Sequence, residues 1–230
     1  MNLIDRPSPN QDARGGAPVD ILILHYTGMT SGEAALTRLC DPAAKVSAHY
    51  AIDEDGTVYA MVPEARRAWH AGISFWAGAR DINTRSIGIE LANPGHEFGY
   101  RPFPDAQISA LTALCRQILD RHPIQPWRVL GHSDVAPARK DDPGELFPWA
   151  GMAAAGIGLW AAPGEDLGEA AVAPLLARYG YDPDVSLEKT VTAFQRHFRP
   201  SRVDGIADRE TRAMLSGLIT AYDAANGVRV

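Results

Sequence analysis

Two histidines and one aspartate have the spacing of a small cation site. His25 ends the apolar, β-branched run 19–25, and His132 ends a shorter run of the same kind, 128–132. Asp142 follows ten residues after His132, across a loop long enough to fold back on that histidine. Residues just beyond strand ends form the sites of open α/β sheets, so we expect these three side chains to converge.

Two imidazoles and one carboxylate are ligands that zinc prefers. Three protein ligands leave the fourth tetrahedral position open to water, as catalytic zinc sites require, whereas a structural site closes all four. Zinc lowers the pKa of bound water to about 7 and polarises carbonyl oxygens, which is what hydrolysis of an unactivated amide needs. The sequence therefore predicts one catalytic Zn²⁺ bound by His25, His132 and Asp142.

Two further charged residues could complete an amide hydrolase. Glu90 lies near the end of the run 86–91, whose apolar side chains would desolvate its carboxylate and raise its pKa toward that of a general base. A strand glutamate paired with an arginine explains the same position, and spacing alone leaves both explanations open. Lys140, two residues before Asp142, could place a cation against an oxyanion, although alone it would be an ordinary solvated lysine.

The elements that must position these residues are a mixture of strands and helices. Asp55-Gly56 lies between two strand-like runs and is a hairpin signal. The longest helical segment repeats apolar residues every three or four positions. Strands are expected at 19–25, 47–53, 57–62, 86–91 and 128–132, and helices at 31–40 and 105–121. This order predicts an α/β (α+β) domain with a mixed central β-sheet flanked by helices.

A second, smaller unit is expected at the C-terminus. The composition turns to Ala, Gly and Pro around residues 151–164, and beyond that point only helical periodicity remains. We place the boundary near Ala162, with a catalytic domain at 1–162 and an all-α domain at 163–230. Three short helices are expected, near 167–179, 187–198 and 208–224.

Four segments of the first domain, taken in order, resemble a known family. They are Leu24-His25-Tyr26-Thr27, Trp69-His70-Ala71-Gly72, the run from Asn83 through Ser-Ile-Gly-Ile to Glu90, and the run from Gly131-His132-Ser-Asp through Arg139-Lys140 to Asp142-Pro-Gly. Together they resemble the type-2 N-acetylmuramoyl-L-alanine amidases, which are zinc amidases related to the peptidoglycan recognition proteins. The resemblance covers about residues 8–149, and the long last segment makes it specific.

This resemblance implies an activity and a set of roles. The family's zinc ligands fall on His25, His132 and Asp142, its catalytic glutamate on Glu90 and its transition-state lysine on Lys140. The implied reaction hydrolyses the amide between the lactyl group of N-acetylmuramic acid, or its 1,6-anhydro form, and the L-alanine of the stem peptide. Groove-lining, substrate-binding positions are expected at Tyr26, Trp69, His70 and Arg139. Trp69 is explained equally well as a core residue.

The C-terminal unit has a resemblance of its own. The run 193–198, with Ala-Phe-Gln, and the run 203–211, with Val-Asp-Gly-Ile, are similar to the small helical peptidoglycan-binding domains of wall hydrolases. Core packing by Phe194 and Phe198 and capping of the last helix by Asp208 explain the same residues. The two explanations are compatible, because a binding module also needs a core. The expected partners are therefore peptidoglycan fragments or polymeric peptidoglycan, and no protein partner is predicted.

Charge and cysteine content exclude other classes of function. The 230 residues have a formal net charge of -6 and contain no run of Lys and Arg, which argues against a nucleic-acid partner. Cys40 and Cys115 are isolated, so neither a CxxC zinc site nor a disulfide framework is expected. A cysteine hydrolase is disfavoured because Cys115 lies on the apolar face of a predicted helix. The main rival is a recognition protein that binds muropeptide without cutting it, but such relatives typically lack a full ligand set.

The compartment is the least determined property. No basic start followed by an apolar run opens the chain, and no stretch of 18 apolar residues occurs, so we expect a cytoplasmic protein without a membrane span. A periplasmic or outer-membrane-associated protein is the alternative if a leader has been removed. The wall-binding resemblance of the C-terminal unit favours that alternative, and the two indications conflict.

Overall fold

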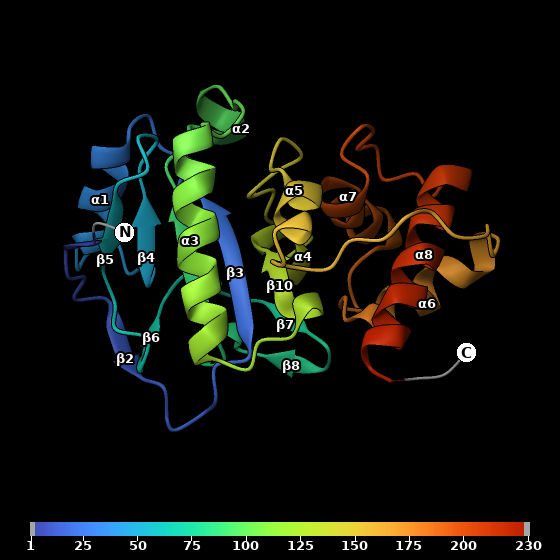
Figure 1. Cartoon of the computed structure of the whole chain (residues 1–230), viewed down its shortest axis with the longest axis horizontal. Coiled ribbons are helices and arrows are strands. Elements are labelled where there is room, and N and C mark those ends of the chain that lie inside the picture. The colour runs from blue at the N-terminus through green and yellow to red at the C-terminus, as the bar shows by residue number, and fades with distance from the viewer. Residues whose placement is uncertain (1–2, 228–230) are drawn as a thin grey trace.

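The computed structural model describes residues 3–227, and its N-terminal part is built on a six-stranded mixed sheet (Figure 1). Across the sheet the strands are β1 (Leu3–Asp5), β5 (Val58–Ala60), β4 (Tyr50–Ile52), β9 (Ser86–Leu91), β3 (Ile21–Tyr26) and β10 (Val129–Gly131). Strands β4 and β5 are antiparallel, as the Asp55-Gly56 hairpin signal predicts, and all other neighbours in this sheet run parallel. The predicted mixed sheet is confirmed.

Two small antiparallel pairs flank this sheet. One joins β2 (Gln11–Ala13) to β6 (Arg66–Ala68), and the other joins β7 (Phe75–Trp76) to β8 (Ala79–Arg80). The sequence did not predict them, because a strand of two or three residues is too short for a periodic pattern.

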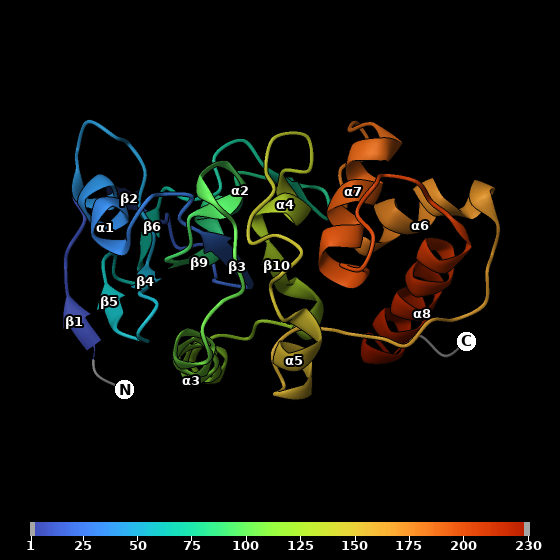
Figure 2. The same cartoon turned by 90° about the horizontal axis from the view of Figure 1, so that it is seen from above.

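Strand β3 is buried on both faces. Leu22 and Leu24 pack into a core cluster with α3 (Asp105–Arg121) and α5 (Trp149–Ala154), and these two helices lie on one side of the sheet (Figure 2). Ile21 and Ile23 point to the opposite side, because successive strand residues alternate between faces. His25 continues the second series and therefore lies on the face opposite α3.

The remaining elements of the N-terminal part are short. Helix α1 (Gly32–Cys40) is preceded by Ser31, whose side chain accepts a hydrogen bond from the Ala34 N–H at 3.1 Å, an N-cap that fixes its start. Both α1 and α3 match the predicted ranges. The other elements are α2 (Gly95–Phe98), α4 (His132–Val135) and the 3-10 turns η1 (Ile82–Thr84) and η2 (Pro126–Arg128).

Three helices form the C-terminal part, as predicted. They are α6 (Val172–Tyr179), preceded by the 3-10 turn η3 (Glu169–Ala171), α7 (Leu187–Phe198) and α8 (Arg209–Ala225). Asp208 caps α8 by accepting from the Thr211 N–H at 2.9 Å. The segment 155–168 contains no helix or strand, and the predicted boundary near Ala162 falls inside it. Within residues 3–227, no helix is long and apolar enough to span a bilayer.

The C-terminal helices pack directly on the N-terminal part. They lie beyond β10 and beside α4 in both views (Figures 1 and 2). One apolar cluster joins the two parts; it contains Ile21, Ile23, Leu130 and Trp76 from the N-terminal part and Leu176, Tyr181, Phe194, Phe198 and Leu215 from the C-terminal part. The C-terminal helices therefore complete the core on the sheet face that bears His25.

Candidate active site

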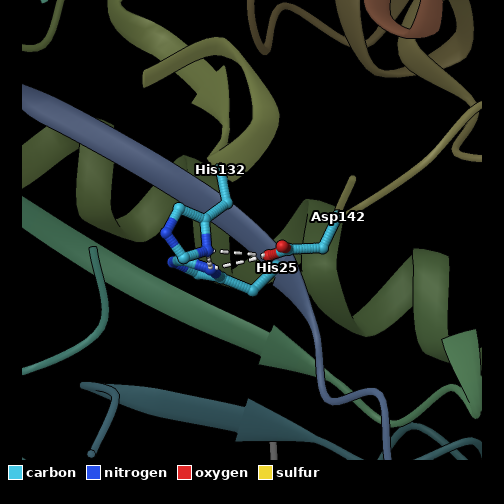
Figure 3. Close-up of side chains that lie close together, drawn as sticks. All are labelled: His25, His132 and Asp142. Atoms are coloured by element: carbon cyan, nitrogen blue, oxygen red, sulfur yellow. Dashed lines mark hydrogen bonds and ion pairs between the residues drawn. The ribbon is translucent and has the colours of Figure 1, made fainter. Parts of the chain in front are cut away.

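Three buried side chains meet at one point (Figure 3). The His25 Nδ1 lies 3.0 Å from the His132 Nδ1 and 2.9 Å from the Asp142 Oδ2. The His132 Nδ1 lies 3.1 Å from the same carboxylate oxygen. The structure thus brings together the three residues that the sequence analysis selected as metal ligands.

The outer nitrogens of the two imidazoles have partners of their own, an arrangement that suits cation binding by the inner nitrogens. The His132 Nε2 lies 3.1 Å from the Ala71 carbonyl, which only accepts, so the tautomer with its proton on Nε2 fits this contact and has a lone pair on Nδ1. Burial, followed by the proximity of His132, lowers the pKa of His25 to about 4, so this ring is also neutral at pH 7. Its Nε2 faces the Nδ1 of His70, which leaves its own Nδ1 directed at the cluster.

These inner atoms fit a zinc ion. Burial raises the pKa of Asp142, but His132 and His25 outweigh that effect and lower it below the usual range, so the carboxylate is ionised. Two nitrogen lone pairs and a carboxylate oxygen at mutual distances of 2.9–3.1 Å repel one another unless a cation lies among them. Tetrahedral zinc with bonds of about 2.0–2.1 Å needs ligand atoms only slightly further apart, and it accepts this set of two nitrogens and one oxygen.

Neighbouring strands explain how the first two ligands meet. His25 lies on β3, and the parallel strand β10 ends at Gly131, opposite Leu24. His132 is the first residue of α4 and not the last residue of the strand, one position away from the sequence prediction. The Asp134 carboxylate accepts from the Gly131 N–H at 2.7 Å, which starts the helix at this point.

A backbone hydrogen bond returns the third ligand to the first two. The Ser133 N–H donates to the Asp142 carbonyl at 2.9 Å, so the loop after α4 closes on the helix where it begins. The sequence predicted this return from loop length alone.

Glu90 has the surroundings of a general base. It lies opposite His25 in the register of β3 and β9. Its Oε2 is buried and has no hydrogen-bond partner among residues 3–227. Burial, followed by the negative charge of Asp142, raises its pKa well above the usual range, while Lys140 acts in the opposite direction. No arginine pairs with Glu90 in this part of the chain, so the general-base hypothesis fits better than a structural ion pair.

A cavity of about 350 Å³ opens in front of these groups. Of the nine residues selected from the sequence, eight line it: Tyr26, Trp69, His70, Glu90, His132, Arg139, Lys140 and Asp142. The ninth, His25, lies behind them at 1% exposure. The Trp69 side chain is half-buried, and its indole nitrogen has no partner among the described residues. The Tyr26 hydroxyl bonds to the His96 Nδ1 at 2.9 Å, and burial raises its pKa to about 12.

His70 does more than line the cavity, because it contacts a metal-ligand candidate. Its Nδ1 lies 3.0 Å from the His25 Nε2, and its Nε2 lies 3.1 Å from the Ser86 hydroxyl, which donates to the Ile82 carbonyl at 2.8 Å. If His25 binds metal through Nδ1, its Nε2–H donates to the His70 Nδ1. The His70 Nε2–H then donates to the Ser86 hydroxyl, so this series of hydrogen bonds has a single arrangement of protons. Gly88 makes room for His70, since a Cβ there would lie 2.4 Å from the imidazole Cγ.

Arg139 also acts on the loop beside the cavity. Its guanidinium donates to the carbonyls of Ala71 and Ile73. The Asn83 Oδ1 accepts from the N–H groups of His70 and Ala71 at 3.1 and 2.7 Å. Asn83 is not among the predicted site residues, although it is the first residue of the motif that ends at Glu90.

Ser86 was also not selected, although a signal existed. The polar or small residues Ser86, Gly88 and Glu90 alternate with the apolar residues of β9, and His25 is the register partner of Glu90. Period-two alternation places these three residues on the site face of the sheet. This pattern could have pointed to Ser86 as a partner of the site.

Comparison with protein families shows which proteins this chain is similar to. A family described as N-acetylmuramoyl-L-alanine amidase matches residues 15–145, and one described as "Putative peptidoglycan binding domain" matches residues 174–215. Among curated proteins, the N-acetylmuramoyl-L-alanine amidase AmiD of Escherichia coli is 40% identical, over 89% of this chain and 83% of AmiD. The 1,6-anhydro-N-acetylmuramyl-L-alanine amidase AmpD of the same species is 36% identical, over 63% of this chain and 86% of AmpD.

Solved structures agree with this result. The complex of E. coli AmiD with the substrate anhydro-N-acetylmuramic acid-L-Ala-D-gamma-Glu-L-Lys superposes with a TM-score of 0.81 at 39% identity, over 92% of this chain and 93% of AmiD. AMPDH3 from Pseudomonas aeruginosa, in complex with anhydromuramic pentapeptide, gives a TM-score of 0.82 at 34% identity, over 89% and 92%. The amidase family match covers more than half of the sequence, and this chain therefore belongs to the N-acetylmuramoyl-L-alanine amidase family.

Proposed function

We propose that this amidase is zinc-dependent and hydrolyses the amide between N-acetylmuramic acid, or its 1,6-anhydro form, and the L-alanine of the stem peptide. One observation carries the proposal: three buried acceptor atoms, on His25, His132 and Asp142, face one another beside the unpartnered carboxylate of Glu90. The substrate follows the similar structures, two of which contain anhydromuramyl peptides.

The residues of this chain divide the reaction between them. Zinc bound by the three ligands supplies Lewis acidity and makes water a usable nucleophile near neutral pH. Glu90 accepts the proton of the attacking water and returns it to the leaving L-alanine amine. Lys140 places its positive charge against the oxyanion that forms on the lactyl carbonyl. The C–N bond breaks, and the products are a lactyl carboxylate and a peptide with a free L-alanine amine.

The cavity walls hold the substrate in this proposal. Trp69 lines the cavity, and its buried indole N–H has no partner among the described residues. Tyr26, His70 and Arg139 line the same cavity, so all four predicted substrate-binding residues remain candidates.

The C-terminal part is proposed to be the peptidoglycan-contacting region, with the catalytic part at 1–162 and the helical part at 163–230. Free muropeptides and polymeric peptidoglycan contain the same scissile amide, so rates on purified anhydromuropeptide and on sacculi distinguish recycling from wall turnover. The cytoplasmic location expected from the sequence remains a prediction. Fractionation of cells that produce the protein from its natural gene tests it, because a product found outside the inner membrane would contradict it.

Removal of the metal tests the proposed function. We expect 1,10-phenanthroline to abolish the release of L-alanine-terminated peptides from anhydromuropeptides, and stoichiometric Zn²⁺ to restore it. Magnesium is the matched control and should restore nothing, since it favours octahedral oxygen ligands. Full activity in metal-free protein would contradict the zinc mechanism. Tight muropeptide binding without any product, with zinc present, would favour the recognition-protein alternative.

A further inference from the structure

The helical C-terminal part contacts the segments that contain two of the metal-ligand candidates, through Asp134 near His132 and Asp141 next to Asp142. His132 begins the four-residue helix α4, and Asp142 lies in the loop that follows it. Neither belongs to a strand of the sheet. Helix α7 lies beside α4, and its neighbouring residues Arg196 and His197 contact one segment each. We propose that α7, together with Tyr181, positions His132 and Asp142, so that the C-terminal part belongs to the metal centre as well as to wall binding. This inference rests on the proposed zinc-dependent function.

The first contact is made through Asp134. This carboxylate is 1% exposed and lies two residues after His132. The His197 Nδ1 donates to its Oδ2 at 2.7 Å, and the Tyr181 hydroxyl donates to its Oδ1 at 2.7 Å. The Gly131 N–H, directly before His132, donates to the same carboxylate at 2.7 Å. Two of the three donors to this buried group thus come from the C-terminal part.

His197 is itself fixed in place. Its ring stacks on Trp149 with a centroid distance of 3.7 Å and an interplanar angle of 20°. Phe198 lies parallel to it at a centroid distance of 3.8 Å. Tyr181 is equally constrained, since it packs edge-on against Trp76 at 5.1 Å. Rigid partners of this kind set the position of the carboxylate that they bond, as in the hydrogen-bonded outer shells of metal sites.

The second contact is made through Asp141, the residue before Asp142. The Arg196 guanidinium lies 2.8 Å from the Asp141 carboxylate and 4.0 Å from Glu145 in the same loop. The Arg196 side chain is 16% exposed and the Asp141 side chain 52%, so this ion pair is partly open to water. Consecutive residues of one helix thus restrain the backbone next to both ligands. A wall-binding role alone would not require either contact.

Zinc affinity separates this positioning role from a merely structural one. His197→Phe keeps the stacking on Trp149 and removes the donor to Asp134, whereas His197→Asn keeps a donor near the position of Nδ1. We expect the dissociation constant for Zn²⁺, measured by competition with a chromophoric chelator, to rise about tenfold in His197→Phe, the lower end of outer-shell effects. His197→Asn should restore most of that loss. Tyr181→Phe combined with His197→Phe should weaken zinc binding further.

Arg80→Gln is the matched control. Arg80 pairs with Asp182 and Asp184 across the same junction, but its side chain is 62% exposed and contacts neither ligand segment. The Arg80→Gln variant should therefore bind zinc with the same affinity as the parent protein. Arg196→Gln tests the second contact and removes only a partly exposed ion pair, so it decides the question even if His197→Phe does not fold. We expect a dissociation constant about threefold higher, consistent with a small number of weakened polar contacts.

Two further measurements use protein without metal and protein at saturating zinc. In metal-free His197→Phe, the amides of residues 131–142 should exchange with deuterium faster than in the parent, while those of β9 should not change. At saturating zinc, kcat and KM should return close to parent values. Unchanged zinc affinity in folded His197→Phe and Arg196→Gln would overturn the inference. A parent protein that binds no zinc at all would instead overturn the proposed function, which keeps the two failures distinct.

Discussion

The two halves of the active site are built in different ways. His25 and Glu90 lie side by side on the adjacent strands β3 and β9, where backbone hydrogen bonds to neighbouring strands fix both residues. Lys140 and Asp142 lie on a loop, and His132 begins a four-residue helix. In the sheet half, formed by His25 and Glu90, the supporting side chains His70 and Ser86 also come from the N-terminal part. The loop half, formed by His132, Lys140 and Asp142, is restrained by side chains from helix α7 in the C-terminal part.

This difference shows how one site can combine rigidity with adjustability. Residues on central strands such as β3 and β9 are held by backbone hydrogen bonds to the strands on both sides, so moving one of them would break several of these bonds. Groups on a short helix and a loop keep their positions only while their side-chain contacts last, since such segments open locally at low free-energy cost. Substitutions in each half should therefore have effects of different size and kind.

The largest effect is expected in the sheet half, from Glu90→Gln. Loss of the general base should lower kcat by about 10²–10⁴-fold while zinc content stays at the parent level. A kcat within twofold of the parent would remove Glu90 from the mechanism. Metal analysis of the same preparation is the necessary control, because loss of zinc would lower kcat for another reason.

The same variant has a predictable effect on stability. Burial raises the pKa of Glu90 well above its usual range, so the folded protein binds this proton more tightly than the unfolded chain does. At pH 7 the unfolded chain releases this proton more readily than the folded protein does, which lowers the free energy of unfolding, so metal-free Glu90→Gln should melt at a higher temperature than the parent. The difference should disappear below the ordinary pKa of glutamate, near pH 4.5.

A smaller effect is expected from the support of His25. His70→Leu removes the acceptor of the His25 Nε2–H and should weaken zinc binding by about 10–100-fold, as other outer-shell changes do. His70→Asn keeps a polar group near Nδ1 and should lose less. Because this support lies within the sheet half, the loss should be the same in the His197→Phe background. A non-additive result would contradict the separation of the two halves.

A smaller effect still is expected where the two halves touch the same loop. Arg139 donates to the Ala71 carbonyl, which also accepts from the His132 Nε2–H. Arg139→Lys keeps the charge and loses part of the donor set, a change worth about 1 kcal/mol, so kcat/KM should fall about fivefold. If Arg139 binds substrate directly, KM will rise with zinc affinity unchanged, and this split distinguishes substrate binding from support of the loop.

Much of the chemistry could be predicted from the sequence because its motifs are local. His25 and His132 were selected because each follows an apolar run, and Asp142 because a short loop can return it to His132. The long helix α3 was predicted to the residue because seventeen residues contain several repeats of its apolar pattern. The fold class and the three C-terminal helices followed from the same periodicities.

Contacts between distant side chains could not be predicted in this way. His70 was expected to line the groove, and its bond to His25 depends on how two segments 45 residues apart pack together. The contact between His197 and Asp134 joins residues 63 apart and depends on the packing of α7 beside α4. Neither residue type nor spacing specifies such a meeting, because it is decided by the whole tertiary packing.

The close approach of His70 to Gly88 has an evolutionary consequence. Any side chain at position 88 would collide with the imidazole, since even a Cβ would lie 2.4 Å from its Cγ. A mutation at 88 alone would push the ring away from His25, and a mutation at 70 alone would leave a void against β9. The two positions are therefore coupled: a larger residue at position 88 fits this packing only if position 70 also changes.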